Sequence, residues 1–262
     1  MKIIPLIENS RVNNYHSERG LSLYIETENR KIIFDTGKSE KFLENMKKLH
    51  IDISEIDYFI ISHGHRDHMG GLLYLLELGI DPQRVILEGG ALNSFSFKLL
   101  FKKEIGLTKE ELKRLEGVRK VEVAGIYRLE ENMYLVSPGG EASSLYYRND
   151  KPDDFTHEIS LVVVEDDKLN IVVGCCHFGL ERLVEFVEKQ FKDREINSIT
   201  GGLHTRSLSL NPIATMKFIL FLKRSRVRGY YLGHCTGRGT ILLLKRFIDG
   251  VNRISIGKKY DI

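Results

Sequence analysis

Apolar runs and helical patterns alternate along this chain and divide into two halves. In the first half, runs typical of buried strands occupy residues 2–7, 21–27, 31–34, 57–61 and 84–87. Apolar residues recur at the spacing of one helix face in residues 39–50 and 71–78. The second half predicts strands at 158–165, 168–173, 197–200, 229–232 and 253–256, and helices at 180–191, 211–223 and 240–248. Each half is therefore a set of strands with helices outside it. Periodicity alone fits either a doubly wound α/β sheet or two facing sheets with helices on both outer faces.

Local signals mark several element ends. Thr108 and Glu111 have the spacing of a capping box, which predicts a helix through Leu115. Asp166-Asp167 lies between two strand patterns and predicts a hairpin. Asn211-Pro212 opens a helical pattern with proline in the first turn.

Residues 89–150 are harder to assign, with short strand-like pieces only at 120–124 and 133–136. We expect the whole chain, residues 1–262, to form one domain in which residues 89–150 are an insert or lid. Aromatic side chains in this segment could cover a site, although a core or dimer contact is favoured for most of them: Phe95, Phe97, Phe101, Tyr127, Tyr146 and Tyr147.

The densest chemistry follows the strand pattern at residues 57–61. Three histidines and one aspartate occur within six positions, at His63, His65, Asp67 and His68. Imidazole and carboxylate groups hold zinc and related ions in catalytic sites. A lone histidine is usually structural, but this cluster with flanking glycines is difficult to explain by packing. A purely structural zinc site would be expected to use cysteine thiolates.

Two metal ions fit these four side chains better than one. Asp67 and His68 are adjacent, and on an extended backbone they would point in different directions. Three later histidines follow strand patterns that end in glycine turns: His177, His204 and His234. Strand ends of this kind bring side chains to one rim, so these residues are candidates for the rest of the site.

The run His63-Gly64-His65-Arg66-Asp67-His68 resembles the His-x-His-x-Asp-His motif of the metallo-β-lactamase superfamily. Residues 20–25 and 32–37 resemble the strands and the Asp-Thr-Gly turn before that motif. Residues 174–177 and 233–237 resemble later metal motifs of one branch, which includes the 7,8-dihydropterin-6-yl-methyl-4-(β-D-ribofuranosyl)aminobenzene-5'-phosphate synthases. The resemblance implies the α+β class and an αββα four-layer sandwich.

The resemblance also implies a ligand set. We expect His63, His65 and His177 on one ion, and Asp67, His68 and His234 on the other. His157 is the rival of His177, because many members place a histidine before this hairpin; the branch motif favours His177. Cys175 occupies a position where many members have an aspartate, and it would either bridge the ions as a thiolate or pack beneath them. We expect two divalent ions, Zn²⁺ before Mn²⁺ or Fe²⁺.

Other side chains are candidates for supporting or catalytic roles. Asp35 would hold a ligand histidine in the right tautomer. Asp67 would orient the attacking hydroxide, and His204 would act as an acid or contact the substrate. Arg206 and Arg238 lie beside the rim motifs and could bind a phosphate or carboxylate; solvated loop arginines are an equally good interpretation.

Composition limits the partners. The net charge of +3 is small and spread along the chain, which argues against a dedicated nucleic-acid surface. No apolar run is long enough to span a membrane, and the start lacks the apolar core of a signal peptide. Three cysteines make a poor disulfide framework, so we expect a cytoplasmic protein. A small, anionic substrate is expected, and a homo-oligomer stays open.

Such a site predicts a metal-dependent hydrolase in which a bridging hydroxide attacks an ester, lactone or phosphoester bond. The alternative from the branch is a synthase that displaces diphosphate from a dihydropterin diphosphate. A flavodiiron-type redox protein is disfavoured, because no flavin domain follows and extra carboxylate ligands are lacking. A non-catalytic zinc module would leave so full a ligand set unexplained.

Overall fold

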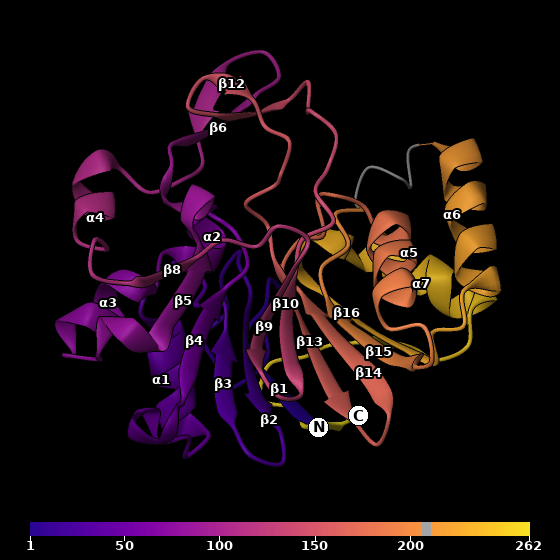
Figure 1. The fold of residues 1–262 in the computed structure, drawn as a ribbon, viewed down its shortest axis with the longest axis horizontal. Helices are drawn as coiled ribbons and strands as arrows, with labels where there is room; N and C mark the ends of the chain where they lie inside the picture. The colour runs from indigo at the N-terminus through magenta and orange to yellow at the C-terminus, as the bar shows by residue number, and fades with distance from the viewer. Residues whose placement is uncertain (206–210) are drawn as a thin grey trace.

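Two seven-stranded sheets face each other in the computed structural model, which describes residues 1–205 and 211–262 (Figure 1). The first sheet has the order β18 (Tyr260–Asp261), β1 (Lys2–Ile7), β2 (Ser22–Glu26), β3 (Lys31–Phe34), β4 (Tyr58–Ile61), β5 (Val85–Glu88) and β8 (Arg119–Val121). The second has the order β17 (Val251–Arg253), β16 (Gly229–Leu232), β15 (Glu195–Gly201), β14 (Lys168–Val173), β13 (Ser160–Glu165), β10 (Met133–Val136) and β9 (Ile126–Glu130).

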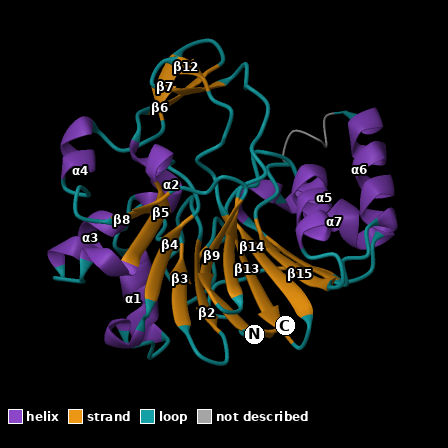
Figure 2. Ribbon diagram, viewed as in Figure 1, coloured by secondary structure: helices purple, strands orange, loops and turns teal. Residues whose placement is uncertain are grey.

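Helices cover the outer face of each sheet (Figure 2). The first sheet packs against α1 (Lys41–Lys48), α2 (Arg66–Met69), α3 (Leu72–Glu77) and α4 (Lys109–Lys113). The second packs against α5 (Leu180–Gln190), α6 (Pro212–Arg224) and α7 (Arg238–Phe247). The expected αββα sandwich is confirmed, and the doubly wound sheet is excluded.

The strand patterns explain the layers, because successive side chains on a strand point to opposite faces. On β13, Leu161 and Val163 face the first sheet, whereas Val162 and Val164 face the helices. On β3, Ile32 and Phe34 lie between the sheets and Ile33 faces α1 and its neighbours. Strands that are apolar on both faces can therefore bury both, which their near-continuous apolar runs require.

Most predicted elements are confirmed within a few residues. The capping box at Thr108 and Glu111 is present, and Asn211 caps α6 through its side chain. Asp166 and Asp167 have φ of 50° and 57°, as a two-residue hairpin turn with left-handed central residues requires. The last predicted strand is displaced: β17 ends at Arg253 rather than extending to residue 256.

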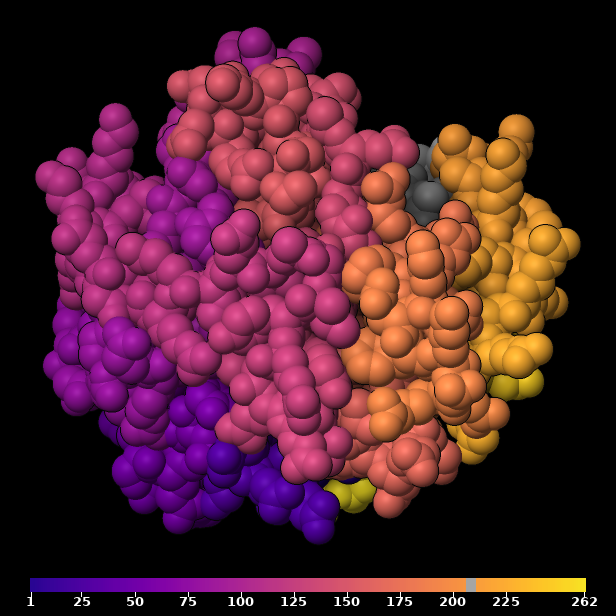
Figure 3. All heavy atoms as spheres, in the orientation of Figure 1, coloured from indigo at the N-terminus to yellow at the C-terminus, as the bar shows by residue number. Residues whose placement is uncertain are grey.

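A small third sheet, which the sequence patterns did not predict, stands above the sandwich at the top of Figure 1. Its order is β12 (Lys151–Pro152), β11 (Tyr146–Arg148), β6 (Phe95–Lys98) and β7 (Lys102–Glu104). The magenta-to-pink part of the chain that contains it spreads over the top and front of the molecule in Figure 3. No helix in the described part of the chain is long and apolar enough to cross a bilayer.

The layer between the sheets gives a stability prediction. Leu161 is fully buried there, so Leu161→Ala should lower the free energy of unfolding by about 2–5 kcal/mol in urea denaturation. Leu78 is 60% exposed, and Leu78→Ala should change that free energy by no more than about 0.5 kcal/mol. Equal losses in the two variants would contradict a packed layer between the sheets.

Candidate metal centre

The carboxyl ends of the central strands meet at one edge of the sandwich. Strands β3, β4 and β5 are parallel in the first sheet, and β14, β15 and β16 are parallel in the second. His63 follows β4, and the three later histidines follow β14, β15 and β16 in turn. Parallel strands thus place residues that are far apart in the sequence at one rim, beneath the small sheet.

The backbone of the histidine motif differs from the extended chain that we expected. Arg66–Met69 forms the one-turn helix α2, so Asp67 and His68 diverge because they are neighbours on a helix. Thr36, which precedes the motif in the sequence, stabilises this turn. Its amide and its hydroxyl both donate hydrogen bonds to the carbonyl oxygen of His68, at 2.7 Å and 3.0 Å. A Cβ on Gly71 would lie 2.4 Å from the Thr36 carbonyl oxygen, so only glycine fits there.

Asp35 ties this motif to the sheet. Its buried carboxylate accepts hydrogen bonds from the amide and the hydroxyl of Ser62, both at 2.8 Å. Nδ1 of His68 lies 2.6 Å from the same carboxylate. This contact places the His68 proton on Nδ1 and leaves Nε2 free to act as a ligand.

Three groups of potential ligand atoms share Cys175, and in each the atoms lie within 4.8 Å of one another. Two of them include a histidine of the first loop: His63, Cys175 and His177, and His68, Cys175 and His234. The third is Cys175, His204 and Cys235. Nε2 of His68 is 3.2 Å from the Cys175 sulfur and 3.1 Å from Nε2 of His234. The structure therefore brings together residues from the first loop and from two strands of the second sheet.

His65 and Asp67 adjoin these groups. Nδ1 of His65 is 3.0 Å from Nε2 of His63, and its ring centroid is 5.0 Å from that of His177. An Asp67 carboxylate oxygen is 3.8 Å from Nε2 of His234. All six residues of the predicted ligand set thus lie at one place.

His157, the rival of His177, lies outside these groups. Its Nε2 is 3.0 Å from the Asp153 carboxylate, and its ring packs against Phe95. His177 is instead fixed by Glu158, which accepts a hydrogen bond from the His177 amide at 2.6 Å and lies 3.3 Å from its Nδ1. The geometry favours His177 as the ligand candidate.

His234 is held by residues at the end of β1. Its amide donates to the Glu8 carboxylate at 3.0 Å, and its Nδ1 is 3.0 Å from the Asn9 side-chain oxygen. The contact at Nδ1 again leaves Nε2 directed toward the centre.

His204 lies at the rim beside a tyrosine of the small sheet. Its Nε2 is 3.1 Å from the Tyr146 hydroxyl, and its amide donates to the Cys235 sulfur at 3.1 Å. The Tyr146 ring stacks on His65, with centroids 5.7 Å apart and planes inclined by 21°. Tyr146 therefore covers the centre and connects it to the small sheet.

The arginine predictions have different outcomes. Arg206 lies outside the described residues. Arg238 is exposed at the start of α7, and the described residues contain no hydrogen bond or ion pair between it and the centre. Arg19, which sequence reasoning missed, lies 3.6 Å from Asp67 and is 80% exposed. Arg19 is thus, within the described residues, a basic side chain that is placed to meet an anion at the rim.

Burial strongly affects which side chains of the metal centre are charged. It lowers the pKa of His63, His65 and His177 well below the ordinary value, with further lowering by neighbouring imidazoles. For His68 burial acts in the same direction, but the Asp35 carboxylate raises its pKa to about 9. Burial raises the pKa of the Cys175 thiol.

The pKa of Asp67 is lowered although burial opposes ionisation, because His68 and His234 are close. Most of the imidazoles are therefore neutral and Asp67 is ionised. These are the forms in which both residue types bind metals.

This donor set fits divalent ions. Nε2 of His65 is buried without a hydrogen-bond partner, and several imidazole nitrogens and two thiols face each other at close range. An unpartnered buried polar atom is costly, and a bound cation would satisfy it. Imidazole and thiol donors suit zinc particularly well.

Comparison with known proteins agrees with this geometry. Residues 18–168 match the model of the metallo-beta-lactamase superfamily. The chain belongs to this superfamily. Its members typically bind metal ions, and the matched region contains the whole histidine motif.

Two similar proteins align with nearly the whole of this chain. It is 27% identical to the 7,8-dihydropterin-6-methyl-4-(beta-D-ribofuranosyl)-aminobenzene-5'-phosphate synthase of Methanocaldococcus jannaschii, across 98% of this chain and 95% of the relative. It is 28% identical to Tm1679, described as a metal-dependent hydrolase of the beta-lactamase superfamily, with a TM-score of 0.83 over 100% and 99% of the two chains. Human short-form tRNase Z, at 13% identity and a TM-score of 0.59 over 100% and 99% of the two chains, shares the fold.

Sequence reasoning missed several residues of the centre. Glu158 follows His157 directly, but a single carboxylate gave no signal that it would support His177. Tyr146 was noted only as one of many aromatic residues in its segment. Glu8 and Asn9 end the first predicted strand, and only the closure of the sheet brings them to His234.

The support given by Asp35 yields a prediction. Asp35→Asn removes the charged acceptor from His68, and the affinity for zinc should fall by about 10- to 100-fold in a chelator competition assay. Asp193→Asn, at an exposed turn, is the matched control and should leave the affinity unchanged. Equal zinc affinity in Asp35→Asn and the parent chain would show that Asp35 does not support the centre.

Proposed function

We propose that this chain is a metal-dependent hydrolase that holds two divalent ions, most suitably Zn²⁺. The observation that carries the proposal is that two ligand groups which include first-loop histidines meet at Cys175, with His65 and Asp67 beside them. His63, His65 and His177 would hold one ion, and Asp67, His68 and His234 the other. Cys175 would contact both. When bound, the ions would supply the Lewis acidity that makes water a nucleophile near neutral pH and stabilises charge on oxygen.

The chain's own residues would do the rest. Asp67, ionised and partly exposed, would accept a hydrogen bond from the attacking water and aim it. His204 would donate a proton from Nε2 to the leaving group: burial opposes its protonation, but the hydrogen bond with Cys235 raises its pKa. Arg19 would meet the negative charge of a small anionic substrate, with Arg238 as a second candidate.

A second candidate is a synthase that displaces diphosphate from a dihydropterin diphosphate. It is favoured by the likeness to the Methanocaldococcus synthase, which extends over nearly the whole of both chains. The same residues would serve, because departing diphosphate also needs charge stabilisation and an anion-binding rim. The hydrolase is supported by the likeness to Tm1679 over the whole chain. We propose a cytoplasmic location for either enzyme, since all three cysteines are free.

Metal content tests the ligand set. The zinc-loaded protein should hold two equivalents by elemental analysis, and His177→Ala should lose one of them. His157→Ala is the matched control, because the side chain of His157 is also buried but contacts Asp153 instead. The ligand assignment is wrong if His157→Ala loses an equivalent and His177→Ala does not.

Substrate assays separate the two functions. The hydrolase should cleave at least one of a generic phosphodiester, a lactone and a thioester, and chelation should abolish that activity. The synthase should instead release diphosphate from a dihydropterin diphosphate only when the ribosylated aminobenzene phosphate is present. Diphosphate release with none of the three hydrolyses would favour the synthase; activity that survives complete metal removal would contradict both.

A further inference from the structure

The third ligand group lies at the outer side of the metal centre. Its members are Cys175, His204 and Cys235, whose ligand atoms lie within 4.8 Å of one another. His204 is exposed and Cys235 is half-buried, whereas the three histidines of the first loop are buried. We call this group the outer group, and the two groups with first-loop histidines the inner groups. The proposed function gives Cys235 no role as a ligand.

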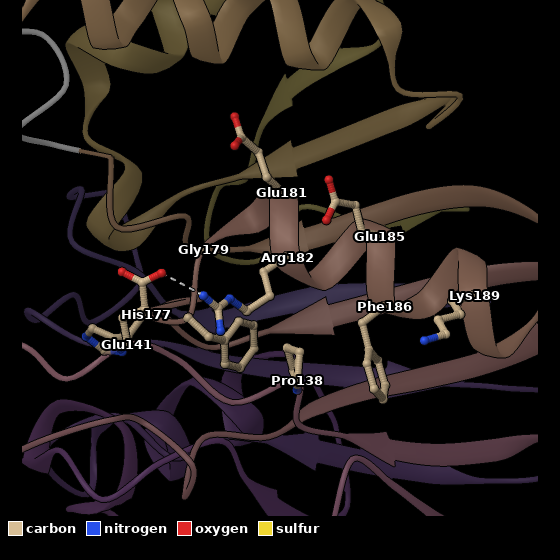
Figure 4. A pocket seen from close by; sticks show the side chains of 10 residues that line it. Pro138, Glu141, His177, Gly179, Glu181, Arg182, Glu185, Phe186 and Lys189 are labelled. Carbon is tan, nitrogen blue, oxygen red and sulfur yellow. Dashed lines mark hydrogen bonds and ion pairs between the residues drawn. The ribbon is translucent and has the colours of Figure 1, made fainter.

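An open approach leads to the outer group. A groove of about 750 Å³ runs between α5 and the loop that follows β10, and His177 lies at one end of it (Figure 4). The ring centroids of His177 and His204 are 4.6 Å apart. An ion that enters from solvent would therefore meet His204 and Cys235 before the buried histidines of the first loop.

The surrounding backbone admits the Cys235 sulfur. A Cβ on Gly202 would lie 2.5 Å from this sulfur, so a side chain at position 202 would displace it. The hydroxyl of Thr236 accepts a hydrogen bond from the Leu203 amide at 3.0 Å, which joins the loops after β15 and β16. The amide of His204 donates to the Cys235 sulfur at 3.1 Å. The ligand atoms of these two loops are thus brought together by the fold itself.

A bound ion suits the two thiols better than a disulfide does. Cys175 follows β14 and Cys235 follows β16, and β15 lies between these strands. At the usual spacing the two strands are about 9–10 Å apart, whereas a disulfide needs Cα atoms about 4.4–6.8 Å apart. Two metal–sulfur bonds of about 2.3 Å each can join sulfurs that lie within 4.8 Å with little movement.

The donor atoms determine the kind of ion. Each inner group offers one sulfur and two imidazoles, whereas the outer group offers two sulfurs and one imidazole. Thiolate ligands favour soft ions, and imidazole is acceptable to many divalent ions. The outer group therefore favours a softer ion than the inner groups do.

We propose that Cys175, His204 and Cys235 form a binding site for a soft, thiophilic cation of the Cu⁺ or Cd²⁺ type. The two sulfurs and the imidazole are its ligands. Because Cys175 belongs to all three groups, an ion at the outer group withdraws this thiol from the inner positions, and it also occupies His204. The soft cation is therefore an inhibitor of the centre. The inhibition rests on the proposed function, whereas the site itself does not.

Cadmium titration of the metal-free full chain, with a non-thiol reductant present, tests the site. Thiolate ligands give cadmium a near-ultraviolet charge-transfer absorption, and the chain has no tryptophan to add to the background. Cys235→Ala should lower this absorption at saturation by about half and weaken cadmium binding by about tenfold or more, because one of two sulfur ligands is lost. Cys176→Ala is the matched control and should change neither, because this buried thiol packs in the core beside the second sheet and lies outside all three groups.

Three results would overturn the inference. Equal absorption in Cys235→Ala and the parent chain would show that cadmium uses Cys175 alone. Unchanged cadmium affinity in His204→Ala would remove the imidazole from the site. A count of one free thiol in the unfolded parent, rather than the three that the sequence contains, would reveal a disulfide.

The same measurements separate the site from the proposed function. A parent chain that holds two zinc equivalents, but whose cadmium absorption does not respond to Cys235→Ala, would lose only the outer site. A halved absorption in Cys235→Ala, in a protein whose zinc-loaded parent hydrolyses nothing, would sustain the outer site and reject the proposed function.

Discussion

The buried carboxylate of Asp35 is the constraint on which the centre depends. It is fully buried, and among the described residues its cationic partner is His68. A buried charge without a partner is costly, so this position requires a positive charge nearby. In the metal-free chain a proton on His68 provides it, which is why the pKa of His68 is raised to about 9 despite burial. A metal ion at Nε2 would satisfy the same requirement, so the site that stabilises the proton is also prepared for a cation.

Asp35 joins the carboxyl ends of two neighbouring parallel strands. Asp35 directly follows β3, Ser62 directly follows β4, and the hydrogen bonds between them fix where the histidine motif begins. Asp35, Cys176, His204 and His234 all have positive φ, between 48° and 59°. Non-glycine residues adopt this backbone at some cost, and the surrounding hydrogen bonds maintain it. The strain is concentrated where the strands of both sheets turn into the centre.

The sequence predicted elements whose signals are local and ligands whose motif is contiguous. The capping box at Thr108 and the hairpin at Asp166 are examples of the first kind. Other features depended on distant contacts. The helix at Asp67 and His68 is held by Thr36, and the choice of His177 over His157 depends on Glu158. The small sheet was missed because its strands have only two to four residues and too little pattern to identify.

Cys175 affects the charge of the centre. It belongs to all three ligand groups at a position where, by the family resemblance, an aspartate is usual. An aspartate there would add one more buried carboxyl group beside those of Asp35 and Glu158. Burial instead raises the pKa of the Cys175 thiol, which favours its neutral form. A thiol thus adds less buried charge than a carboxylate would, and a bound cation would stabilise its thiolate form as a ligand.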